Sequence, residues 1–99
     1  MEREKLVRRL NSVGKEMFVR YYFLFKDYAD GKIGKRSAAQ KLIDDGVSNE
    51  EGASIRLSNA KAIFAEAENC KALGLVQQSQ KVPSAIIQAA GEILKVHCR

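Results

Sequence analysis

Apolar residues between positions 6 and 28 recur at a helical spacing, and this pattern restricts the fold more than any other feature. Successive members are separated by four, three, four, four, three and four residues, and they are Leu6, Leu10, Val13, Met17, Tyr21, Leu24 and Tyr28. Such intervals place the side chains on one face of an α-helix. Asn11, Ser12 and Gly14 interrupt this pattern with residues that favour helix ends. The segment could therefore form one long helix, or two shorter helices of which Ser12 caps the second.

Aromatic residues in the same segment leave a β-strand over residues 19–25 open as an alternative, because aromatic side chains favour strands. No partner strand is evident elsewhere in the sequence, which favours the helix. Packing in a core or a dimer interface explains the rings better than base stacking does, since a chain without tryptophan must build its core from them.

A second helical signal lies on both sides of Gly46. Apolar residues at helical spacing precede it, a glycine is typical of a helix end, and Ser48 with Glu51 has the S-x-x-E spacing of a capping box. Helix, tight turn and helix together resemble a helix-turn-helix element over residues 35–68. The first turn of its second helix contains Glu50 and Glu51, whose charges repel phosphates, so the resemblance is stronger as architecture than as DNA recognition.

The remaining chain continues the helical pattern. The helix that begins after Ser48 is expected to continue to Leu73 and end at Gly74, and Pro83 is expected to start a last helix whose apolar face reaches Val96. We therefore predict an all-α fold, a small bundle of four to five helices in a single domain of residues 1–99. A second copy could complete it as a dimer.

The cysteines and the amino-terminal segment bear on metal binding and location. Cys70 and Cys98 form neither a disulfide framework nor a C-x-x-C pair, so free thiols are expected, and His97 beside Cys98 does not make a metal site. No cofactor is predicted. The first ten residues are charged from Glu2 onward and lack an apolar signal core, which predicts a cytoplasmic protein. No segment has the roughly 20 apolar residues that span a bilayer, so no membrane association is expected.

Charge divides the chain into three parts. The net charge of +5 combines +5 over residues 1–36, −3 over 37–68 and +3 over 69–99. If the chain ends fold near each other, a positive surface would attract phosphates or an acidic protein. That surface would comprise Arg3, Lys5, Arg8, Arg9, Lys15, Lys95 and Arg99.

A nucleic-acid-binding site is the first functional prediction. Gly31 to Ser37 forms a basic turn but lacks the spacing of a phosphate-binding nucleotide loop, so nucleotide hydrolysis is rejected. The polar face after Ser48, with Ser54, Ser58 and Asn59, could read base edges. The predicted contacts are Arg8, Arg9, Lys32, Lys35, Arg36, Arg56 and Lys61.

The alternative is a protein-interaction or adaptor module that acts as a homo-oligomer. Its predicted interface residues are Tyr21, Phe25, Tyr28, Leu57 and Phe64. No nucleophile, base and acid are arranged for catalysis, and no small-molecule substrate is evident, so the chain is expected not to be an enzyme.

Overall fold

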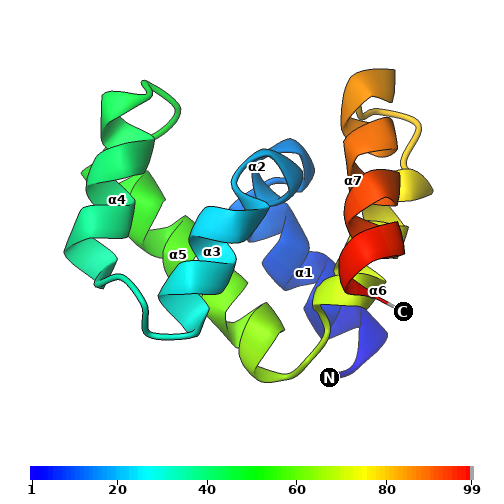
Figure 1. Ribbon diagram of the computed structural model, residues 1–99, viewed down its shortest axis with the longest axis horizontal. Coiled ribbons are helices and arrows are strands. Elements are labelled where there is room, and N and C mark those ends of the chain that lie inside the picture. Colours follow the sequence, from blue (N-terminus) through cyan, green and yellow to red (C-terminus); the bar gives the residue numbers. More distant parts are fainter. Residues whose placement is uncertain (99) are drawn as a thin grey trace.

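A computed structural model describes residues 1–98, which form seven α-helices and no strand (Figure 1). The helices are α1 (Arg3–Val13), α2 (Lys15–Arg20), α3 (Tyr22–Ala29), α4 (Lys35–Asp44), α5 (Glu50–Ala65), α6 (Asn69–Gln77) and α7 (Ser84–His97). The all-α prediction is confirmed. The expected number of four to five helices was too low, because three short interruptions divide segments that the apolar pattern presents as continuous.

The apolar stripe from Leu6 to Tyr28 is divided among three helices. Gly14 has φ +94°, a conformation that side chains with a Cβ rarely adopt, and it ends α1. A second break lies at Tyr21. Ser12 stays inside α1, where its hydroxyl donates to the Arg8 carbonyl at 3.1 Å, so it does not cap α2.

The turn at Gly46 forms as predicted, but the cap that follows differs. Gly46 has φ +74°, and the N–H groups of Gly46 and Val47 donate back into the last turn of α4 at 3.0 and 3.1 Å. Asn49, not Ser48, is the N-cap of α5, because its side-chain oxygen accepts the Gly52 N–H at 2.7 Å. The expected capping box does not form, because position 52, three residues after Asn49, is a glycine without a side chain to reach back.

Helix α5 ends at Ala65 instead of continuing to Leu73. Ala67 has φ +56°, and the N–H of Glu68 donates to the Ile63 carbonyl at 2.9 Å in a helix-ending turn that usually contains glycine. Gly74 consequently lies inside α6 instead of ending a helix. The last helix begins directly after Pro83, as predicted.

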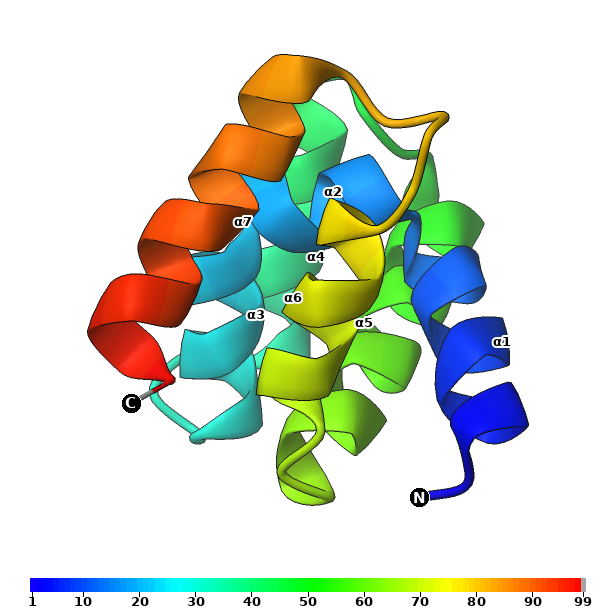
Figure 2. The ribbon, with the colours of Figure 1, turned by 90° about the vertical axis from the view of Figure 1, so that its right-hand side faces the viewer.

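Helix α5 lies at the centre of the first five helices. Helices α1, α3 and α4 pack against it, while α6 lies between α1 and α7 (Figures 1 and 2). The core joins large side chains from most of these elements. Its largest fully buried members are Tyr22, Phe18, Phe25, Leu10, Leu42, Leu57, Ile63, Leu73, Val13 and Val76.

A disulfide joins Cys70, near the start of α6, to Cys98, directly after α7. The prediction of free thiols was wrong, because helix pairing brings together two cysteines that are 28 residues apart. Disulfides persist mainly in oxidising compartments, so the bond agrees poorly with the predicted cytoplasmic location. Within residues 1–98, no helix is long and apolar enough to cross a membrane.

Candidate nucleic-acid interface

One turn of α5, residues 58–61, collects basic side chains from three helices. Arg9 of α1 donates from Nη1 to Oδ1 of Asn59 at 3.3 Å, and Lys35 of α4 donates from Nζ to Oγ of Ser58 at 2.9 Å. Lys61 follows on α5, with its Nζ 5.2 Å from the centre of the Tyr28 ring. Side chains that are 52 positions apart along the chain thus come within one turn of the same helix.

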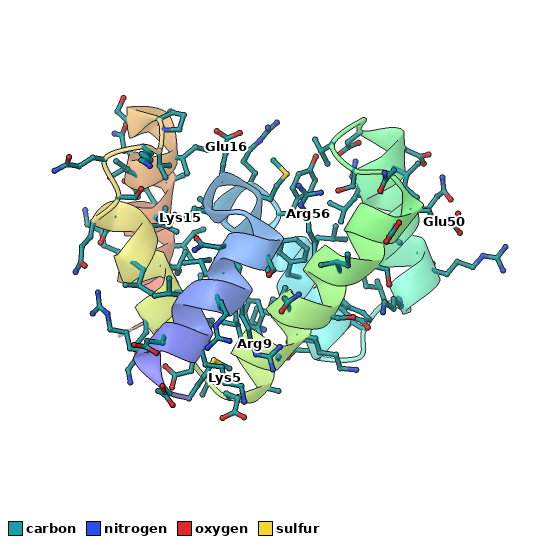
Figure 3. All side chains as sticks on the ribbon, turned by 180° about the vertical axis from the view of Figure 1, so that it is seen from behind. Lys5, Arg9, Lys15, Glu16, Glu50 and Arg56 are labelled. Carbon is teal, nitrogen blue, oxygen red and sulfur yellow. A yellow bond between two sulfur atoms is a disulfide. The ribbon has the colours of Figure 1, made fainter. Side chains whose placement is uncertain are left out.

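Two hollows extend this surface on either side of α5. The first lies between α1 and α5, has a volume of about 230 Å³, and is lined by Lys5, Arg8, Arg9, Ser12 and Asn59, with no carboxylate (Figure 3). The second lies between α4 and α5 and has a volume of about 440 Å³; the carboxylate of Glu50 lines it together with Lys35 and Arg36. We call the six basic residues of this surface the basic face. They are Lys5, Arg8, Arg9, Lys35, Arg36 and Lys61.

The positive charges of the basic face are not neutralised by the chain. Over the described residues, none of these six side chains forms an ion pair with a carboxylate. The Nε of Arg9 is buried and has no hydrogen-bond acceptor. The surface therefore retains both charge and donor capacity for an anion.

Two predicted contacts lie outside this surface. Arg56 is half-buried, and its guanidinium donates to the carbonyl of Val13 at 2.9 Å and to the hydroxyl of Ser48, so it ties α5 to the end of α1 and to the turn before α5 (Figure 3). That role is structural. Lys32 is exposed in the loop between α3 and α4, and its ammonium group forms no hydrogen bond or ion pair within residues 1–98.

The start of α5 and the end of α4 form an acidic region beside the basic face. Glu50 and Glu51 occupy the first turn of α5. The Tyr21 hydroxyl donates to Asp45 at 2.8 Å, and together with Lys41 it holds the pKa of that carboxyl below its usual value. Burial, with the same hydrogen bond, raises the pKa of Tyr21. The carboxyl group of Asp45, at the end of α4, therefore stays ionised to a lower pH than usual.

The residues predicted as a protein interface separate into two groups. Phe25 and Leu57 are fully buried in the core of their own chain, so they are not available to contact a second one. Tyr21, Tyr28 and Phe64 are half-buried. The exposed large apolar side chains are instead Phe23, Ile55 and Val96, of which Phe23 is 51% and Val96 64% exposed.

The predicted surface from both chain ends is not assembled from the described residues. Helix α6 separates α1, which carries Lys5 and Arg8, from α7, which carries Lys95 (Figure 2). Arg99 lies outside the described residues. The sequence placed Ser58 and Asn59 on a polar helix face that could read base edges, but it did not indicate that side chains of α1 and α4 hydrogen-bond them.

Metal coordination has no support in residues 1–98, where no group of three or more His, Cys, Asp and Glu side chains could hold an ion. The ring of His97 packs instead against Phe23, with the ring centres 5.1 Å apart. Comparison of the chain with protein-family models, curated proteins and solved structures gives no match.

Proposed function

We propose that this protein binds nucleic acid by holding the phosphate backbone on its basic face, and that it catalyses no reaction. The supporting observation is the convergence of Arg9, Lys35 and Lys61 on one turn of α5 without an ion pair in the described part of the chain. Cations that neutralise phosphates release counterions, which is the main source of sequence-independent affinity for nucleic acids.

The polar groups between the cations fit the same role. Ser58 and Asn59 lie between side chains of α1 and α4, and hydroxyl and amide groups commonly hydrogen-bond phosphate or sugar oxygens. Like charges brought together repel each other, most strongly in the α1–α5 hollow, which no carboxylate lines, and an anion on the surface removes that repulsion. The proposed ligand therefore stabilises an arrangement that is electrostatically unfavourable without it.

The acidic first turn of α5 favours one orientation. A helix-turn-helix protein inserts the start of its second helix into the major groove. Here that start carries Glu50 and Glu51, whereas the basic side chains lie over α1, α4 and the middle of α5. We propose backbone contact centred on the α1–α5 hollow of the basic face, because Glu50 at the start of α5 lines the other hollow and repels phosphates.

Fluorescence anisotropy tests this proposal with duplex DNA, single-stranded DNA and RNA at low and near-physiological salt. The double variant Arg8→Ala/Lys35→Ala is expected to weaken binding and to reduce the salt dependence by about one unit of slope per lost contact. Lys81→Ala, which removes an exposed charge between α6 and α7, is the control. Absence of binding to all three probes at low salt, or equal affinity for the double variant and the wild type, would contradict the proposal.

A homo-oligomeric interaction module is the second candidate function. It is favoured by the exposed Phe23, which packs on His97 across α3 and α7 and offers an apolar contact surface. Light scattering coupled to size-exclusion chromatography tests it over a wide protein concentration. This candidate predicts an oligomer that Phe23→Asp dissociates, and a monomer at every concentration excludes it.

A further inference from the structure

A groove runs between α1 and α6, on a side of α1 different from the one that carries the basic face. Two hollows form it, with volumes of about 410 and 270 Å³, and they share Arg3, Leu75 and Gln78. Apolar side chains of α1 line it, namely Leu6 in the first hollow and Val7 and Leu10 in the second. Figure 2 shows the two helices side by side. The volume of the larger hollow is within the range of small-molecule sites, and its lining combines apolar with charged side chains.

Gly74 lines the larger hollow from the interior of α6. Glycine destabilises the interior of a helix relative to alanine, and the backbone here does not require it, because Gly74 has no positive φ. A Cβ at this position would meet no atom within 4 Å. The absent side chain therefore leaves the hollow open, at a cost in helix stability that packing does not explain.

The rim of the groove is positive. Arg3, the first residue of α1, and Lys15, the first residue of α2, both line the smaller hollow, and neither forms an ion pair within residues 1–98. Glu68 in the larger hollow is already compensated, because the Met1 amine hydrogen-bonds it at 3.1 Å and Lys71 lies 3.6 Å away. A ligand would thus meet an apolar floor and uncompensated cations.

We propose that this groove binds an amphipathic anion, an aliphatic monocarboxylate whose hydrocarbon chain covers the half-buried Val7 and Leu75. Its carboxylate would meet Arg3 or Lys15, since a charge-assisted hydrogen bond to a carboxylate is stronger than a neutral one. The apolar side chains in the groove favour a hydrocarbon chain, and the unpaired cations at its rim favour a negatively charged head group. The proposal stands independently of nucleic-acid binding, because Arg3, Val7 and Lys15 lie outside the basic face.

Calorimetric titration of the disulfide-bonded protein tests the ligand class with three probes of equal chain length. Decanoate, used below its micelle concentration, is expected to bind saturably and about tenfold more tightly than decanol, which lacks the charge. Decyltrimethylammonium, with the opposite charge, is expected to bind most weakly. Equal affinity for all three probes, or no saturable binding of decanoate, would overturn the proposal.

Two variants test the location of the site. Gly74→Leu fills the larger hollow and favours the helix, so it should reduce decanoate affinity at least about tenfold without lowering the melting temperature. Gln88→Leu adds an exposed leucine on α7, outside the groove, and should leave binding unchanged. If Gly74→Leu does not fold, the double variant Arg3→Gln/Lys15→Gln tests the site instead. It should bind decanoate no more tightly than decanol. The proposed site would be refuted if the double variant still preferred decanoate, or if a folded Gly74→Leu bound decanoate as tightly as the wild type.

Discussion

Helices α5 and α7 are the two longest, with 16 and 14 residues, yet they are held in different ways. Four residues of α5 are fully buried, namely Ala53, Leu57, Ala60 and Ile63, and three other helices pack around them. Helix α7 fully buries only Ala90, and its remaining apolar face is half-buried. A disulfide fixes its carboxyl end. A helix that buries little apolar surface gains little from packing, and a covalent cross-link compensates by restricting the unfolded chain.

The largest expected effect is the loss of packing in α5. Leu57→Ala should reduce the free energy of unfolding by about 4 kcal/mol, because it removes a fully buried side chain and leaves a cavity. Leu94→Ala on α7 should cost only about 1.5 kcal/mol, because Leu94 is half-buried. Urea denaturation measures both values. Equal costs at the two positions would invalidate the contrast between the helices.

Removal of the disulfide should have the next largest effect. Cys70→Ser/Cys98→Ser, or reduction of the wild type, should cost about 3 kcal/mol, since the bond closes a loop over a sequence separation of 28 residues. Hydrogen exchange should show the amides of α7 losing protection before those of α5. Uniform loss of protection in both helices would show that α7 is no more dependent on the bond than α5.

Arg56 sharpens the contrast within α5. Arg56→Gln should cost about 2 kcal/mol, because it leaves the Val13 carbonyl without the charged donor that it has in the half-buried contact. Lys61→Gln, on the exposed side of the same helix, should change stability by less than about 0.5 kcal/mol but weaken nucleic-acid binding. If Arg56→Gln instead kept its stability and lost much of its affinity for nucleic acid, Arg56 would belong to the binding surface.

A smaller, stabilising effect is expected where α5 turns toward α6. Ala67 has φ +56°, so Ala67→Gly should raise the free energy of unfolding by about 0.7 kcal/mol through relief of left-handed strain. Ala62→Gly, inside α5, should instead lower it by about 1 kcal/mol. Thermal denaturation of the two variants measures both effects. If both substitutions lowered the stability, the left-handed conformation of residue 67 would be contradicted.

Acid should have the mildest effect. Hydrogen bonds from Tyr21 and Lys41 lower the pKa of Asp45, and the Met1 amine and Lys71 lower that of Glu68. A lowered pKa stabilises the fold above the unfolded value of about 4, and this contribution is lost as pH falls through the folded value. Unfolding curves should therefore be flat from pH 7 to about 5 and shift to lower denaturant below it. Asp45→Asn should reduce that shift, and an unchanged shift would exclude Asp45 as a contributor.

The sequence predicts the helical class well, because the spacing of apolar residues reports directly on which faces are buried. Gly46 and Pro83 mark their helix boundaries for simple steric reasons. The break at Ala67 was not predictable, because alanine favours helices and adopts the left-handed conformation only where the surrounding contacts impose it. The break near Gly14 was one of the two alternatives that the sequence left open, whereas no sequence signal marked the break at Tyr21.

The candidate site was predicted in part. Arg8, Arg9, Lys35, Arg36 and Lys61 were identified by charge alone, and charge is visible in a sequence. The structural role of Arg56 depends on the approach of α1 and the turn before α5, which only tertiary structure reveals. The pairing of Cys70 with Cys98 was missed for the same reason, since connectivity between distant cysteines follows from how helices pack.

The position of the disulfide also sets an order of events during synthesis. The helices that surround α5 are complete once residue 65 has been made, whereas the bond requires Cys98. No disulfide therefore restrains the chain until the whole of α7 has been synthesised.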